Sequence, residues 1–287
     1  MKMPKQLLIV LLLFIFSASA SAQAPTEKTV SVFGAKIAYV EAGDPSKPTV
    51  ILLHGLGGNS GNWLFTIPAL AANYHVIAPD QIGFGKSDRV MLKYRVGTYV
   101  DFLDKFMSEL KIEKASLVGN SLGGWVAAWT AIKYPNRVEK IILVDAAGLK
   151  PAAVDMAQIY SLNYSTREEV RQIVKLVFYN QALFGSDAFI EQSLNVRVTA
   201  NDGYTINSLI ESIKRDEDFL NGRLGEIKKP TLIIWGKQDG LLKVADAEQF
   251  KREIAGSELL VFDQCGHVPM VEKALDFNKA VLTFLAK

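Results

Sequence analysis

The stretch ASLVGNSLGG, residues 115–124, decides the fold, and the rest of the chain can be interpreted outward from it. Its first residues form an apolar run that is typical of a short buried strand, and the Ala-rich segment 125–132 favours a helix. Ser121 therefore stands at a sharp strand-to-helix turn inside a Gly-x-Ser-x-Gly motif. Larger side chains than those of Gly119 and Gly123 would collide across this turn. We interpret the motif as a nucleophile elbow, in which the helix N-terminus favours developing negative charge.

Strands and helices alternate along most of the chain. Strands that alternate with helices predict an α/β fold with a mostly parallel sheet that is covered on both faces. The expected strands are 29–33, 36–40, 49–53, 74–78, 138–144, 231–235 and 259–262, and the expected helices are 63–72, 99–110, 245–254 and 273–285.

The alternation stops in residues 148–228, which we interpret as a helical cap inserted into a core made of 23–147 and 229–287. The insert falls between two strands, so we expect it over their carboxyl ends, where open α/β sheets bind ligands. A second structural layer with no role in binding is the alternative. The insert is rich in aromatic residues: Tyr160, Tyr164, Phe178, Tyr179, Phe184, Phe189, Tyr204 and Phe219.

Residues 1–22 have the features of an export signal. Lys2 and Lys5 provide a positive start, residues 7–16 are an uncharged apolar run of ten, and residues 20–22 fit an Ala-x-Ala cleavage site. The run is shorter than a membrane span requires. We expect a periplasmic or secreted bacterial protein without stable membrane insertion after cleavage, and an uncleaved N-terminal membrane anchor is the alternative.

Composition limits the classes of partner. The chain has 287 residues, of which 49% are apolar, so it can bury a large core. Lys and Arg total 32 against 30 Asp and Glu, and no basic block interleaves with aromatic residues, so nucleic-acid binding is not predicted. Cys265 is the only cysteine, so an exported form would depend on its core and not on a disulfide.

A serine nucleophile needs a base within hydrogen-bond reach, and the base needs an orienting acid. Of the three histidines, His54 precedes a glycine loop, His75 opens a strand, and His267 lies in an irregular loop after a strand. Loops at strand ends often carry catalytic groups, so His267 is the predicted base. Asp239 is the predicted acid that holds the histidine tautomer, and Asp145, at the end of another strand, is its competitor.

The tetrahedral intermediate of such a reaction carries an oxyanion that needs two donors. The backbone N–H of Leu122, directly after the serine, is one predicted donor, and that of Leu56, in a glycine-rich loop after a strand, is the other. Neither a His-Glu-x-x-His nor a Cys-x-x-Cys motif occurs, so we expect neither a metal nor a cofactor.

Four further residues are candidates for contact with a small-molecule substrate. Met270, close after the predicted base, and the cap residues Phe178 and Phe184 indicate an apolar acyl pocket. Packing inside the cap is the alternative for these aromatic residues. Asn120 either orients the substrate or supports the turn.

The chain order Ser121, Asp239, His267, the elbow, and the DQIGFGKS stretch at residues 80–87 together resemble the α/β-hydrolase superfamily. The resemblance covers essentially the whole chain after residue 22. It implies an eight-stranded sheet whose second strand is antiparallel, and a helical cap after the sixth strand.

Two branches of that superfamily are similar to this chain. The motifs GNSLGG (119–124), VDAAG (144–148) and CGH (265–267) resemble both the carbon–carbon-bond hydrolases of aromatic degradation and small bacterial esterases of the monoacylglycerol-lipase type. The carbon–carbon hydrolases usually carry a tryptophan after the catalytic histidine, where this chain has Val268, and a cap arginine that holds the acidic end of the substrate. In this chain Ser193 stands at the position that best corresponds to that arginine, and Arg197 is nearby in the sequence.

The resemblance and the residues together predict a serine carboxylester hydrolase of the esterase or lipase type. It would cleave small to medium hydrophobic acyl esters through an acyl-enzyme on Ser121. A carbon–carbon-bond hydrolase of the meta-cleavage-product type is one alternative. A non-catalytic binding protein is another, which the loss of a triad residue would favour.

Overall fold

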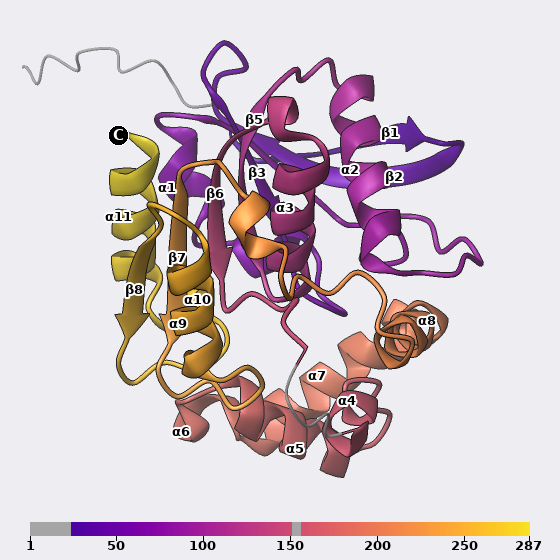
Figure 1. Ribbon diagram of the computed structural model, residues 1–287. Helices are drawn as coiled ribbons and strands as arrows, with labels where there is room; N and C mark the ends of the chain where they lie inside the picture. Colours follow the sequence, from indigo (N-terminus) through magenta and orange to yellow (C-terminus); the bar gives the residue numbers. More distant parts are fainter. Residues whose placement is uncertain (1–23, 151–155) are drawn as a thin grey trace, which may run out of the picture.

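The computed structural model describes residues 24–150 and 156–287, so the predicted signal segment over 1–22 lies outside the described residues, as does the part of the predicted cap at 151–155. The described residues form an eight-stranded sheet with the order β1-β2-β4-β3-β5-β6-β7-β8 (Figure 1). The strands are β1 (Thr26–Val32), β2 (Ala35–Ala42), β3 (Thr49–Leu53), β4 (His75–Pro79), β5 (Ala115–Asn120), β6 (Val138–Val144), β7 (Thr231–Gly236) and β8 (Glu258–Phe262).

The sheet is mixed but mostly parallel. Strand β2 pairs antiparallel with β1 and β4, and all pairs from β4 to β8 are parallel. This confirms the predicted fold class and the antiparallel second strand. Continuous apolar runs form the central strands because both faces are covered: in β3, Ile51 and Leu53 join one buried cluster, and Val50 and Leu52 join the other.

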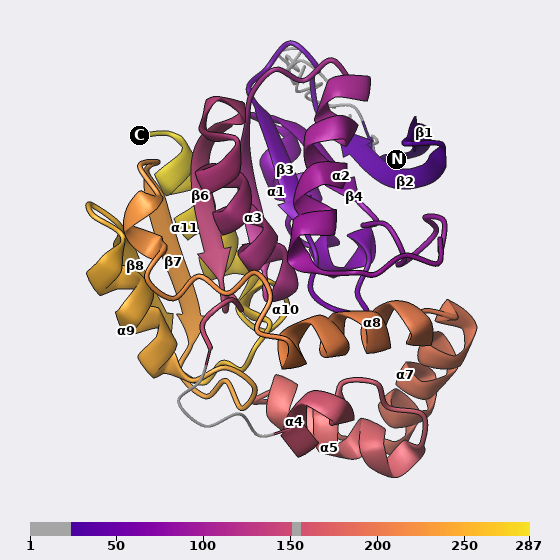
Figure 2. The same cartoon turned by 45° about the vertical axis from the view of Figure 1, so that its right-hand side comes forward.

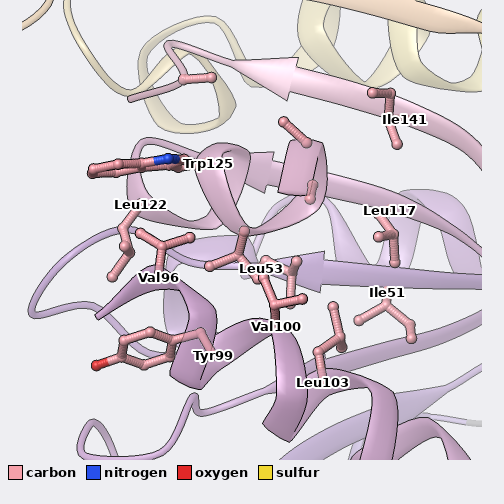
Figure 3. Packing of buried hydrophobic residues seen from close by; sticks show 14 of the residues in the cluster. Ile51, Leu53, Val96, Tyr99, Val100, Leu103, Leu117, Leu122, Trp125 and Ile141 are labelled. Carbon is pink, nitrogen blue, oxygen red and sulfur yellow. The ribbon is translucent and has the colours of Figure 1, made fainter. Parts of the chain in front are cut away.

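Helices cover both faces of the sheet. Figure 3 shows one face, where side chains of α2 and α3 pack on those of β3, β5 and β6. This face carries α2 (Val96–Glu109), α3 (Leu122–Lys133) and α9 (Val244–Glu253), and the opposite face carries α1 (Ile67–Ala71) and α11 (Ala274–Leu285).

Helices between β6 and β7 lie over the carboxyl ends of the parallel strands (Figures 1 and 2). Their own apolar core is small, with Val170, Val174 and Ile190 buried. We refer to α4 to α8 as the cap helices. They are α4 (Met156–Ser161), α5 (Arg167–Val177), α6 (Gln181–Phe184), α7 (Asp187–Ala200) and α8 (Gly203–Lys214).

One predicted helix differs from the structure, and one short helix was not predicted. The helix expected over 63–72 is replaced by a 3-10 turn, Ser60–Trp63, and the short α1, which has Pro68 in its first turn. Proline lacks an N–H group and fits the start of a helix but not its interior, so the helix cannot begin at residue 63. The last expected helix, over 273–285, is observed as α11, and a short helix that was not expected, α10 (Pro269–Glu272), precedes it. In the described part of the chain, no helix has the length and apolar character that crossing a membrane requires.

Candidate active site

Ser121 occupies the turn between β5 and α3 in a backbone conformation with positive φ, at φ 55° and ψ −117°. Its N–H donates to the backbone oxygen of Val144 at 3.0 Å. A Cβ on Gly119 would lie 2.2 Å from the backbone oxygen of Gly123, and one on Gly123 would lie 2.1 Å from that of Leu53. The turn therefore requires glycine on both sides, and the surrounding backbone holds the serine in a strained conformation.

The predicted base and acid meet beside this end of the sheet. His267 Nδ1 lies 2.7 Å from Asp239 Oδ2, and the two residues are 28 positions apart in the sequence. The other carboxylate oxygen accepts the N–H groups of Leu241 at 2.8 Å and Leu242 at 3.0 Å. Because an ionised carboxylate can only accept, Nδ1 carries the proton and Nε2 is left as the basic nitrogen. Both side chains are buried.

Further hydrogen bonds join the loop of His267 to the elbow and to the cap. Asn120 Nδ2 donates to the backbone oxygens of His267 at 3.1 Å and of Val144 at 3.2 Å. The N–H of His267 donates to the backbone oxygen of Val177, at the end of α5, at 2.7 Å. The amide nitrogen of Asn120 thus supports the turn, and contact of this residue with a substrate stays a prediction.

Glu272 is a positioning residue to which the sequence analysis gave no role. Its carboxylate accepts the N–H groups of Gly266 at 2.7 Å, Tyr179 at 3.0 Å and Asn180 at 2.9 Å. It therefore connects the loop of His267 to the cap segment that follows α5. An acid five positions beyond the histidine was visible in the sequence, but no local pattern assigns it these partners.

The glycine-rich loop with the predicted second oxyanion donor lies directly against the serine. A Cβ on Gly55 would come within 3.2 Å of Ser121 Cβ. His54 shapes this loop: its Nδ1 lies 2.7 Å from the backbone oxygen of Gly55, and its Nε2 accepts the N–H of Gln81 at 2.9 Å. Burial lowers the pKa of His54, so the ring is neutral and structural. The Leu56 amide follows in this loop, and Leu122 provides the first amide of α3.

The predicted apolar substrate contacts lie in well-packed surroundings. Met270 is fully buried in the core cluster on the α1 and α11 face. The rings of Phe178 and Phe184 stack with centroids 4.0 Å apart, and both rings pack edge-on against Phe189. These rings therefore belong to the core of the cap, and their contact with a substrate stays a prediction.

A hollow of about 580 Å³ flanks the oxyanion loop. Gly57 and Gly58 line it from the loop, Leu64 from the following turn, and Val196 and Ala200 from α7 of the cap. Neither the serine nor the histidine is among its lining residues. The hollow is therefore a space beside the reacting groups, between the cap and the sheet domain.

One group of His and Asp side chains in residues 24–150 and 156–287 has ligand atoms close enough for a metal ion. It consists of Asp145, Asp239 and His267, whose ligand atoms lie within 4.8 Å of one another. Asp145, the competitor for the role of acid, is fully buried and accepts the N–H of Gly236 at 2.8 Å. Burial and the charge of Asp239 raise the pKa of Asp145 well above its ordinary value.

Comparisons with known proteins show the family of this fold. A sequence profile described as alpha/beta hydrolase fold matches residues 48–274. The 2-hydroxy-6-oxo-6-phenylhexa-2,4-dienoate hydrolase of Comamonas testosteroni is 33% identical over 91% of this chain and 94% of its own. The dihydrolipoyllysine-residue acetyltransferase component of the acetoin cleaving system of Cupriavidus necator is 32% identical over 86% of this chain, which spans 66% of that relative. A solved membrane phospholipase A, described as a bacterial virulence factor, superposes with a TM-score of 0.82 at 30% identity, over 91% of this chain and 86% of its own.

Proposed function

The chain belongs to the alpha/beta hydrolase fold family and is a hydrolase, and on that premise we propose that it cleaves carboxylic esters through an acyl-enzyme on Ser121. The serine Oγ attacks the ester carbonyl carbon while His267 Nε2 takes the hydroxyl proton. Asp239 holds the ring through Nδ1 and stabilises the imidazolium that forms. The N–H groups of Leu56 and Leu122 stabilise the oxyanion.

Collapse of the tetrahedral intermediate then breaks the bond to the alcohol oxygen, which receives the proton from His267 Nε2. A water molecule attacks the acyl-enzyme, and the same nitrogen takes its proton. The second intermediate releases the carboxylic acid and returns the proton to Ser121 Oγ, so the enzyme is regenerated.

The contacts of Arg197 favour an ester over a substrate with an acidic end as the substrate of this protein. Its side chain is 8% exposed and forms an ion pair with Asp202, whose side chain is 2% exposed. Arg197 also donates to Asn163 Oδ1 and to the backbone oxygen of Tyr164, and it stacks over the Tyr164 ring at 5.4 Å. The charge of this cap arginine is thus neutralised inside the cap. Breaking a buried ion pair costs about 3–5 kcal/mol, so a substrate carboxylate would compete poorly for it.

Carbon–carbon bond hydrolysis is the second candidate, and the curated relatives favour it. The Comamonas testosteroni relative, which matches this chain over nearly its full length, is named for a dienoate that carries a carboxylate. The same serine, histidine and aspartate could serve that reaction. The phospholipase A that shares the fold at 30% identity supports the ester reading instead.

A direct competition of substrates separates the two functions. The kcat/KM of the purified protein is measured on chromogenic esters of rising acyl length and on 2-hydroxy-6-oxo-6-phenylhexa-2,4-dienoate. We expect the esters to be cleaved faster, because no carboxylate has to be bound. Faster cleavage of the dienoate would overturn the ester proposal and establish the second candidate.

Two serine variants test whether the reaction uses the elbow. We expect Ser121→Ala to lose roughly 10⁶-fold in kcat, because removal of a triad nucleophile has an effect of that size. Ser46→Ala is the matched control, since that serine lies in an exposed turn. Retention of activity by Ser121→Ala would contradict both candidate functions.

A further inference from the structure

A second carboxyl group is buried beside the candidate triad, and the mechanism above does not use it. Asp145 directly follows β6 and its side chain is fully buried. Its Oδ1 accepts the N–H of Gly236, whereas its Oδ2 is buried and no N–H group of the described residues donates to it. A side-chain hydrogen bond with Asp239 contributes to the raised pKa of Asp145. Its φ of 42° is left-handed, which is unfavourable for a residue with a side chain. Both features cost free energy and point to a role at this position.

The titratable groups that face Asp145 come from three elements. Asp239 lies in the loop after β7, Cys265 and His267 lie in the loop after β8, and Glu272 ends α10. The ligand atoms of Asp145, Asp239 and His267 lie within 4.8 Å of one another. Only the histidine in this group can carry a positive charge. Ionisation of both aspartates would therefore bury a negative charge without a partner.

The two aspartates differ in how well their surroundings stabilise a charge. Asp239 accepts three N–H groups, from Leu241, Leu242 and His267, and such bonds favour the ionised form. Asp145 accepts one, and its burial and the charge of Asp239 raise its pKa. The proton of the pair therefore resides on Asp145. Loss of the charge on Asp239 would remove the second largest obstacle to ionisation of Asp145, after its burial, and would lower its pKa.

We propose that Asp145 is a second acid of this site, neutral while Asp239 is charged and able to replace Asp239 as the partner of His267 when that charge is lost. The inference rests on the proposed function, in which His267 is the base. In the absence of Asp239, Asp145 releases its proton to solvent, and its carboxylate accepts the Nδ1 hydrogen of the imidazolium. Oδ2 is the atom available for this bond, because no N–H group of the described residues donates to it and the side chain of Asp239 is then absent.

A cycle of three variants tests the replacement on the purified full-length chain. Asp239→Ala is used because an asparagine amide would donate toward Nδ1 and impose the wrong tautomer, an error that costs about 10⁴-fold in kcat. We expect Asp239→Ala to lose roughly 100-fold in kcat. We expect Asp239→Ala with Asp145→Ala, which leaves neither an acid nor an amide at Nδ1, to lose roughly 10⁴-fold, the cost of removing a triad acid altogether. Asp145→Ala alone should lose less than about tenfold in kcat, because Asp239 still holds the ring of His267.

One outcome of this cycle would contradict the proposal. If Asp239→Ala alone loses about 10⁴-fold and the second substitution adds nothing, Asp145 does not replace Asp239. Thermal unfolding of each variant separates loss of the acid from loss of the fold. A double variant that unfolds at the temperature of Asp239→Ala, yet is far less active, supports the proposal.

An infrared measurement tests the same inference without any substrate. The difference spectrum between the wild type and Asp145→Asn reports the carbonyl band of a protonated carboxyl at position 145. We expect this band at neutral pH, and we expect it to vanish at lower pH in Asp239→Ala than in the wild type, because the charge of Asp239 no longer opposes ionisation. Absence of the band from the wild type would overturn the inference. If no ester or dienoate is cleaved, the proposed function fails, but this spectrum still decides the protonation of Asp145.

Discussion

Every residue of β5 and β7 in the sheet is buried, whereas α5 has only Val170 and Val174 buried and α7 only Ile190. The sheet is sandwiched between two large apolar clusters, one on each face. The cap instead leaves aliphatic side chains exposed, such as Leu183 at 60% and Val198 at 68%. Its polar contacts are correspondingly prominent, including the capping box of Thr166 and Glu169 and the ion pair of Arg197 with Asp202.

The difference shows how one chain can hold reacting groups rigidly below a less densely packed cover. Apolar burial is non-directional and is shared by many residues of the sheet. Outside α8, which packs Ile206, Leu209 and Ile210 into the core of the sheet, the cap depends more on directional polar contacts such as those of Arg197. One junction of the two regions is the end of α5, where the backbone oxygens of Leu176 and Val177 accept the N–H groups of Gly240 and His267. Each region and this junction can be perturbed separately.

The largest effect is expected in the sheet, at the elbow. Gly123→Ala would place a Cβ 2.1 Å from the backbone oxygen of Leu53, and neither backbone can yield without disturbing β3 or α3. We expect a loss of about 4 kcal/mol or more in the free energy of unfolding, measured by chemical denaturation. Gly225→Ala is the control, because the nearest atom, the backbone oxygen of Glu253, would lie 3.9 Å away. A change below about 1 kcal/mol in Gly123→Ala would contradict the steric argument.

A smaller effect, confined to the cap, is expected from the buried ion pair. Arg197→Met leaves Asp202 buried without its partner, so we expect the free energy of unfolding to fall by about 3 kcal/mol. Amide hydrogen exchange should become faster in α7 and α8. Adding Asp202→Asn should restore part of the loss. Arg167→Met is the control: its pair with Glu191 is exposed, at 61% and 46%, and should contribute less than about 1 kcal/mol. Equal losses from the two pairs would show that burial does not distinguish them.

The smallest effect on stability is expected at the junction. Glu272→Gln replaces a carboxylate that accepts three N–H groups by an amide that has a single acceptor oxygen. We expect the free energy of unfolding to fall by about 1–2 kcal/mol. We also expect kcat to fall, because the loop of His267 is held less firmly. Glu226→Gln serves as the control, since that side chain is 47% exposed and pairs only with Arg223. An unchanged kcat in Glu272→Gln would show that this contact stabilises the cap without positioning the base.

Hydrophobic pattern and turn chemistry were sufficient to predict the sheet and most of its helices. The strand expected over 231–235 is observed as Thr231–Gly236, and the helix expected over 245–254 is observed as Val244–Glu253. The helix expected over 63–72 was wrong because the apolar pattern was given more weight than Pro68, which can only stand at a helix start.

Part of the candidate site could be predicted because it depends on strand ends. Asp239 and His267 follow neighbouring parallel strands, whose carboxyl ends lie at one edge of the sheet, and the structure brings the two side chains into contact. The aromatic residues of the cap offered no such rule. Phe178 and Phe184 could have faced a substrate or each other, and the structure places them against each other.

By itself, the sequence determined the α/β fold, the elbow at Ser121 and the chain order of the candidate triad. These features depend on local backbone geometry and on periodicity, which neighbouring residues encode. Only the tertiary structure decided that Arg197 pairs with Asp202 inside the cap and that Asp145 lies beside Asp239. The charge state of a buried group depends on every group that folding brings within a few ångströms, and those groups come from distant parts of the chain.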